Sequence, residues 1–189
     1  YLTVLVLLVA TLSLVASFIN QDFEIAYVAR HSDLAMPSRF TWVAFYAGNE
    51  GSLLLIAFVL SAMSAIAIWR APEKVRDTLP YTTAVLMLVL AFFLAVLAFM
   101  ADPFEKLPFV PADGEGLNPL LTHLGMFFHP PALMAGLIGI TLPFAFALGS
   151  QLGGKSGDEW VDEGRRWGVI SWALLAAGLL LGSWWAYTI

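Results

Sequence analysis

Apolar residues gather along this chain in five runs, separated by shorter polar stretches. Each run is long enough to cross a bilayer as a helix, which takes about 20 mostly apolar residues. The runs cover residues 1–19, 40–69, 79–101, 129–150 and 167–187. Each should be helical, because a lone strand in lipid would leave its backbone polar groups unpaired. The pattern predicts an all-α, polytopic integral membrane protein, with one helical membrane domain over residues 1–189.

Composition supports a membrane environment. The chain is 60% hydrophobic and 12% charged, with a mean hydropathy of +0.81, whereas a soluble domain has about 25% charged residues. The net charge is −5 and no basic cluster points to a nucleic-acid partner. Cysteine is absent, which excludes disulfides, thiolate metal sites and a cysteine nucleophile within this chain. The first run starts at Tyr1 without an initiator Met, and we expect the chain to be a fragment of a longer protein.

Lys and Arg residues are more numerous in two of the four polar stretches than in the other two. Residues 70–78 and 151–166 carry six Lys and Arg, against three in residues 20–39 and 102–128. The positive-inside rule therefore places the first two stretches in the cytoplasm and the other two outside. Within residues 102–128, apolar residues recur at helical spacing, which predicts a short interfacial helix over residues 117–128.

His129 opens the fourth run at its outer end and is followed by Pro130 and Pro131. Proline suits a first helical turn, so the histidine should be held on a rigid backbone near the membrane boundary. An imidazole in that position is a good axial ligand for haem iron. The alternative is a histidine that bonds to a neighbouring helix or to water.

The other candidate site residues also have simple structural interpretations. Glu50 is expected near the outer face, where it complements a helix dipole or contacts a cofactor, a substrate or a proton path. Trp184 and Trp185 end the last run, as in an aromatic belt. His123 lies about 240° from His129 on an ideal helix, so we read it as a loop residue. His31 is read as a surface residue, and the three histidines lack the spacing of a zinc site.

Several of these segments resemble the N-terminal part of the CcmF/NrfE-type cytochrome c maturation haem lyases. The resemblance covers nearly the whole chain, and its most specific part is Asn118-Pro119-Leu120-Leu121 followed by His129-Pro130-Pro131. The other matching segments are residues 22–29, Glu50-Gly51-Ser52, Pro103-Phe104, Arg166-Trp167 and Gly182-Ser183-Trp184-Trp185. Two departures are Asn49, where many relatives have His, and His123, where relatives usually have another polar residue.

The resemblance implies a function. Members take haem from a haem chaperone and attach it to apocytochrome c on the outer side of the bacterial cytoplasmic (inner) membrane, together with other cytochrome c maturation membrane subunits. They also hold a haem b, and the resemblance makes His129 an axial ligand of its iron. Trp184 and Trp185 would border the outer haem surface, and Glu50 would shape that surface nearby. The fragment alone is expected to be inactive.

Two other functions fit the residues. A membrane transporter would use broken helices and an intramembrane histidine as a substrate or proton path. A non-catalytic scaffold subunit of a membrane complex would tolerate loss of His129. Within the family, the fragment does not separate the general lyase from the nitrite-reductase-specific one.

Overall fold

The structure is a computed structural model that describes residues 1–155 and 157–189. Within them, five helical segments are long and apolar enough to cross a membrane. They are Leu2–Ile19, Asn49–Trp69, Glu73–Phe99, Leu124–Leu152 and Val161–Thr188. The protein is an all-α, multi-pass membrane protein, and the prediction of its fold class is confirmed.

Short 3₁₀ turns, labelled η, lie between some of the α-helices. In order, the elements are α1 (Leu2–Ile19), α2 (Ala26–His31), η1 (Ser38–Phe40), α3 (Thr41–Phe45), α4 (Asn49–Trp69), η2 (Glu73–Thr78), α5 (Leu79–Phe99), η3 (Pro119–Leu121), η4 (Leu124–Phe127), α6 (His129–Gly139), α7 (Thr141–Leu152) and α8 (Val161–Thr188).

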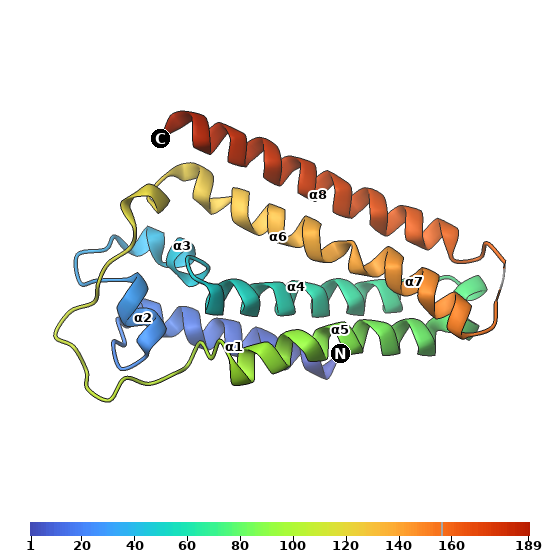
Figure 1. Ribbon diagram of the computed structural model, residues 1–189, viewed down its shortest axis with the longest axis horizontal. Helices are drawn as coiled ribbons and strands as arrows, with labels where there is room; N and C mark the ends of the chain where they lie inside the picture. The colour runs from blue at the N-terminus through green and yellow to red at the C-terminus, as the bar shows by residue number, and fades with distance from the viewer. Residues whose placement is uncertain (156) are drawn as a thin grey trace.

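The long helices lie side by side along the length of the molecule (Figure 1). α4 packs against α1, α5 and α6, and α6 packs against α8. Leu14, Leu60 and Leu86 are fully buried between these helices, whereas Phe92 and Leu180 remain exposed. Exposed apolar faces suit a bundle whose surroundings are hydrocarbon, because lipid tails are as apolar as the side chains.

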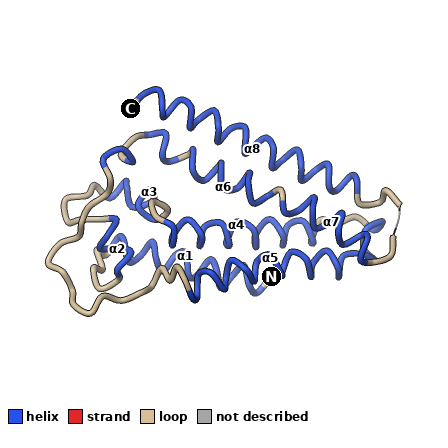
Figure 2. The backbone as a smooth tube through the Cα atoms, in the orientation of Figure 1, coloured by secondary structure: helices blue, strands red, loops and turns tan. Residues whose placement is uncertain are grey.

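Most loops gather at the two ends of the bundle (Figure 2). One end carries residues 20–48 and 100–128 and is called the loop end. The other carries residues 70–78, 153–155 and 157–166 and is called the basic end. Arg165 and Arg166, expected in a loop, lie in the first turns of α8, because that helix begins at Val161.

The apolar run over residues 40–69 is divided in the structure. Its first part forms η1 and α3, the chain turns at residues 46–48, and the membrane-spanning helix α4 begins at Asn49. Gly51 lets α4 start close to α3, since a Cβ there would lie 1.7 Å from the Phe45 carbonyl oxygen. Hydropathy does not reveal this break, because both parts are apolar.

Residues 117–128 form two 3₁₀ turns, η3 and η4, rather than one short helix. The Asn118 side chain accepts a hydrogen bond from Leu120 N–H, and His123 Nδ1 accepts one from Gly125 N–H. Each polar side chain therefore starts its own turn and competes with a continuous helix.

The fourth membrane-spanning segment is broken at Ile140, between α6 and α7. Pro143 explains the break, because its nitrogen cannot donate to the Gly139 carbonyl and its ring crowds that carbonyl. α6 packs against α8 and α4, whereas α7 packs against α5 and α8. The break thus redirects the second half of the segment towards α5 (Figure 1).

α6 and α8 approach closely through small residues. A Cβ at Gly136 would lie 2.3 Å from the backbone nitrogen of Leu175, and a Cβ at Gly178 would lie 2.6 Å from that of Leu133. Glycines at such contacts let helix backbones pack closely in a membrane. This interface positions the first residue of α6 against the last turns of α8.

Candidate functional site

His129 is the first residue of α6 and lies at the loop end of the bundle. Pro130 and Pro131 follow in the first turn, where their missing N–H groups interrupt no helical hydrogen bond. Phe128 precedes the helix with φ −120° and ψ −37°. The half-buried imidazole is therefore carried by a backbone with little freedom.

A backbone carbonyl orients the His129 ring. Its Nδ1 lies 2.7 Å from the carbonyl oxygen of Gly178 on α8. Because a carbonyl oxygen can only accept, Nδ1 carries the proton and donates it. In the neutral ring, Nε2 then keeps its lone pair. This is the tautomer of a metal-binding histidine whose second nitrogen is fixed by the protein.

Gly182 provides the space that this ring occupies. A Cβ at residue 182 would lie 2.5 Å from His129 Cε1 and 2.7 Å from its Nδ1. Gly178 and Gly182 lie four residues apart, a spacing that is typical of close helix packing. In the structure the two glycines also hold the histidine, one through its carbonyl and the other through its missing side chain.

Trp185 packs on the candidate ligand. Its ring stacks on that of His129, with centroids 6.1 Å apart and an angle of 17° between the planes. Its Nε1–H donates to the Leu120 carbonyl oxygen at 3.3 Å. Trp184 instead lies against His123, with ring centroids 5.1 Å apart, and is 42% exposed. One tryptophan is thus fixed beside His129, while the other offers an open apolar face.

His123 connects the loop end to the end of α8. Its Nδ1 accepts from Gly125 N–H at 3.0 Å, so the proton of the neutral ring lies on Nε2. Nε2 lies 3.2 Å from the Thr188 hydroxyl, which accepts a hydrogen bond from the Nε2–H group and can itself donate to the Trp184 carbonyl at 3.0 Å. Both ring nitrogens are occupied, so His123 holds η4 to α8 and has no nitrogen left for a metal.

Glu50 lies in the first turn of α4, where a carboxylate complements the helix dipole. Its neighbour Tyr27 donates a hydrogen bond from its hydroxyl to the Phe45 carbonyl at 3.1 Å and accepts one from Gly48 N–H at 2.9 Å. Burial raises the pKa of Tyr27, and the charge of Glu50 raises it further. Glu50 thus lies beside the α3–α4 turn, and within the described residues it forms no ion pair or hydrogen bond with His129.

His31 lies in a different part of the loop end. Its Nδ1–H donates to the Tyr27 carbonyl at 2.9 Å, and its ring packs on that of Tyr27 with centroids 4.4 Å apart. It borders a cavity of about 430 Å³ together with Arg30, Glu115 and Asn118. His31 is therefore partly covered, although the sequence suggested a surface residue.

Sequence reasoning missed the tyrosines that organise the loop end. Tyr27 fixes the α3–α4 turn, and the buried Tyr46 hydroxyl donates to the Met126 carbonyl of η4 at 2.7 Å. Both are polar aromatic residues within apolar surroundings. A search for tyrosines that need a buried partner could have found them.

The family described as cytochrome c assembly protein matches residues 46–189, which is most of the chain. The chain belongs to this family. The resemblance drawn from the motifs is thereby confirmed. No solved structure matches the chain.

Curated relatives match over most of the chain. It is 38% identical over 172 residues to the cytochrome c-type biogenesis protein CcmF of Pseudomonas fluorescens, covering 90% of this chain and 26% of that protein. It is 40% identical over 171 residues to the probable cytochrome c-type biogenesis protein NrfE of Escherichia coli, covering 90% and 31%. It is 37% identical over 182 residues to Escherichia coli CcmF, covering 94% and 28%. The chain thus spans roughly a quarter to a third of these relatives' length.

Proposed function

We propose that this chain is the N-terminal part of a cytochrome c haem lyase, and that His129 is an axial ligand of a b-type haem at the loop end. The observation that carries the proposal is the His129 ring, whose Nδ1–H donates to the Gly178 carbonyl and leaves Nε2 available for iron. Family membership supports the process, since the relatives are named cytochrome c-type biogenesis proteins.

The donor set fits a haem better than a bare ion. Within residues 1–155 and 157–189, no group of three or more His, Asp or Glu side chains could hold a metal ion. A porphyrin brings its own four nitrogens, so one protein imidazole suffices on one side of the iron. The bound haem would supply a redox-active iron.

The chain's own residues would orient the group and shield it. Trp185 stacks on the imidazole and limits its rotation. Phe128 and Trp184, which are 59% and 42% exposed, would offer apolar surface to a porphyrin and keep water away. Glu50 has the weakest support, because it lies beside Tyr27 and the α3–α4 turn.

The whole protein's partners belong to the same proposal. Haem attachment needs a haem chaperone as donor and apocytochrome c as acceptor, and we place the chain beside other cytochrome c maturation membrane subunits. The chain covers only 26–31% of the relatives' length. Attachment itself is therefore proposed for the whole protein.

A haem measurement on the full-length protein tests the ligand. In His129→Ala, haem b measured by the pyridine haemochrome assay should fall several-fold, and the reduced-minus-oxidised spectrum should shift. His123→Asn is the matched control, since Asn can still cap η4 and His123 has no free nitrogen; its haem content should stay normal. Added imidazole should restore part of the haem in His129→Gly. A haem b content equal to that of the parent protein, with an unshifted spectrum, in His129→Ala would contradict the ligand assignment.

We further propose that the loop end faces the periplasm and that the membrane is the bacterial cytoplasmic (inner) membrane. The excess of Lys and Arg in residues 70–78 and 151–166 supports this orientation. Single cysteines can test it, because the chain has none of its own. Glu73→Cys and Val110→Cys suit labelling, since these side chains are 83% and 65% exposed. An impermeant thiol reagent applied to intact cells with opened outer membranes should label only Val110→Cys; labelling of both, or of Glu73→Cys alone, contradicts the topology.

A further inference from the structure

A second cavity, of about 390 Å³, opens at the basic end between the last turn of α4 and the first turns of α8. Its lining residues are Ile66, Arg70, Glu163, Arg166, Trp167 and Ile170. The cavity follows from the break at Ile140, because α7 turns towards α5 and no longer continues the line of α6 between α4 and α8. It lies at the opposite end of the bundle from His129.

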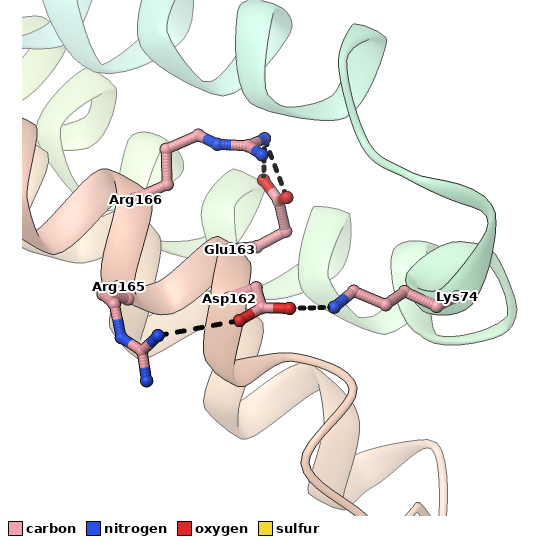
Figure 3. Close-up of polar contacts among 5 residues, drawn as sticks. All are labelled: Lys74, Asp162, Glu163, Arg165 and Arg166. Carbon is pink, nitrogen blue, oxygen red and sulfur yellow. Dashed lines mark hydrogen bonds and ion pairs between the residues drawn. The ribbon is translucent and has the colours of Figure 1, made fainter.

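Arg166 is held in place at the edge of this cavity by a buried carboxylate. Glu163 is 1% exposed, and its two oxygens lie 2.8 and 3.0 Å from Arg166 Nη1 (Figure 3). A buried carboxylate is strongly unfavourable without such a partner. The pair leaves the other guanidinium nitrogens of Arg166 available, and its side chain is 56% exposed. Glu163 therefore fixes the guanidinium and neutralises one positive charge.

Arg70 adds a second guanidinium that has no carboxylate of its own. It follows the last residue of α4 and is exposed. Other basic residues at this end pair with carboxylates; these pairs are Lys74 with Asp162, Arg76 with Glu73, Lys155 with Asp77, and Arg165 with Asp162. Among the described residues Arg70 makes no such pair. The lining thus carries one net positive charge and two guanidiniums, a combination that binds phosphate oxygens well.

The rest of the lining is apolar. Ile66 and Ile170 lie one helical turn from the two arginines and are 46% and 39% exposed, while Trp167 is 7% exposed and closes the wall. Trp69, the residue before Arg70 in the chain, is 75% exposed, as tryptophans often are at the level of lipid headgroups. A ligand that fits must carry an anionic group at the arginines and hydrocarbon next to the isoleucines.

We propose that this cavity binds the phosphate group of an anionic phospholipid from the leaflet at the basic end, with Arg70 and Arg166 on the phosphate and Ile66 and Ile170 beside the first acyl carbons. Basic pockets between membrane helices are a known setting for anionic headgroups. The site is independent of haem, so its test and that of His129 can fail separately.

Native mass spectrometry of the full-length protein in detergent, titrated with phosphatidylglycerol, tests the site. Arg70→Gln should weaken binding about tenfold, the effect of losing one charge-assisted hydrogen bond. Arg166→Gln alone would leave Glu163 buried without a partner, so the second variant is Glu163→Gln with Arg166→Gln, and it should show a similar loss. Haem content should stay unchanged in both.

Arg165→Gln is the matched control, because Arg165 neighbours Arg166 in the chain but points away from it, towards Asp162 (Figure 3). Its phosphatidylglycerol affinity should stay at the parent value. An equal loss in Arg165→Gln would show general attraction to a basic surface and overturn the site. No loss in Arg70→Gln would overturn it as well. Inorganic phosphate should compete poorly, and competition as strong as that of a short-chain phosphatidylglycerol would exclude a lipid as the ligand.

Discussion

Each end of the bundle is stabilised by a different kind of interaction. At the loop end, apart from the exposed pair of Lys106 with Glu24, side chains bond mainly to backbone carbonyls: Tyr27 to Phe45, Tyr46 to Met126 and His129 to Gly178. At the basic end, charged side chains pair with one another, mostly in exposed positions, as in Lys74 with Asp162 and Lys155 with Asp77; the pair of Arg166 with the buried Glu163 is the exception. The first kind of bond joins distant segments of the backbone, whereas the second joins the tips of long side chains.

The difference shows what each end can do. A buried hydrogen bond to a carbonyl fixes direction, because leaving either partner unpaired is costly. An exposed ion pair is weak and readily exchanged for water or another ion. The loop end is therefore suited to orient one imidazole. The basic end, where Arg70 has no carboxylate partner among the described residues, is suited to attract an anion. Substitutions at each end can test this contrast.

The largest effect is expected from Gly182→Ala. The added Cβ would lie 2.5 Å from His129 Cε1, so the ring must move and its bond to the Gly178 carbonyl weakens. Loss of such an orienting partner typically lowers metal affinity by roughly tenfold to a hundredfold. Haem titration of the full-length protein measures the change.

Gly168→Ala provides the control for this helix. A Cβ at residue 168 meets nothing within 4 Å, so the change should leave haem affinity unaltered. If Gly182→Ala binds haem as tightly as Gly168→Ala does, the loop end does not orient the imidazole as described.

A smaller effect is expected from Tyr27→Phe. The change removes the hydroxyl between the Phe45 carbonyl and Gly48 N–H, which should lower the free energy of unfolding by roughly 1–2 kcal/mol. Thermal unfolding in detergent measures the difference. An unchanged midpoint would show that the α3–α4 turn does not depend on this contact.

Tyr27 also predicts a pH dependence. Burial raises its pKa above the usual value of about 10, so the folded protein holds the phenolic proton more tightly than the unfolded chain. Its contribution to stability is present below pH ~10 and is lost as the pH rises through the folded-state pKa. Tyr27→Phe should show a shallower alkaline loss. Part of the loss should remain, because burial raises the pKa of Tyr46 too.

The smallest effect is expected from Lys74→Gln at the basic end. Lys74 and Asp162 are 41% and 59% exposed, so water and salt replace much of what their pair supplies. The unfolding midpoint should match that of the parent protein within error. A loss as large as that of Tyr27→Phe would remove the contrast between the two ends.

The membrane-spanning architecture could be predicted because bilayer thickness sets the length of each apolar run. Breaks within apolar stretches could not be located in that way. The turn at residues 46–48 depends on a contact with Tyr27, and the break at Ile140 depends on one proline. Neither the contact nor the proline changes the mean hydropathy of its apolar run. The helical spacing of residues 117–128 was real, but two side-chain caps divided the segment.

The candidate site could be predicted only in part. His129 stood out because a histidine before two prolines at a membrane boundary is chemically unusual. The partner of its Nδ1 lies 49 positions away in the chain, and only the packing of α6 on α8 brings it close. The packing of Trp185 on His129 and of Trp184 on His123 is likewise a tertiary contact that an aromatic belt does not specify.

We expect the break at Ile140 to limit how far a disturbance travels along the fourth membrane-spanning segment. A continuous helix would act as a stiff rod from His129 to the basic end, whereas this segment has a joint near its middle. α6 packs on α8 and α4, and α7 packs on α5 as well as α8. We therefore expect substitutions at the contact of α7 with α5 to disturb the imidazole less than substitutions at the contact of α6 with α8.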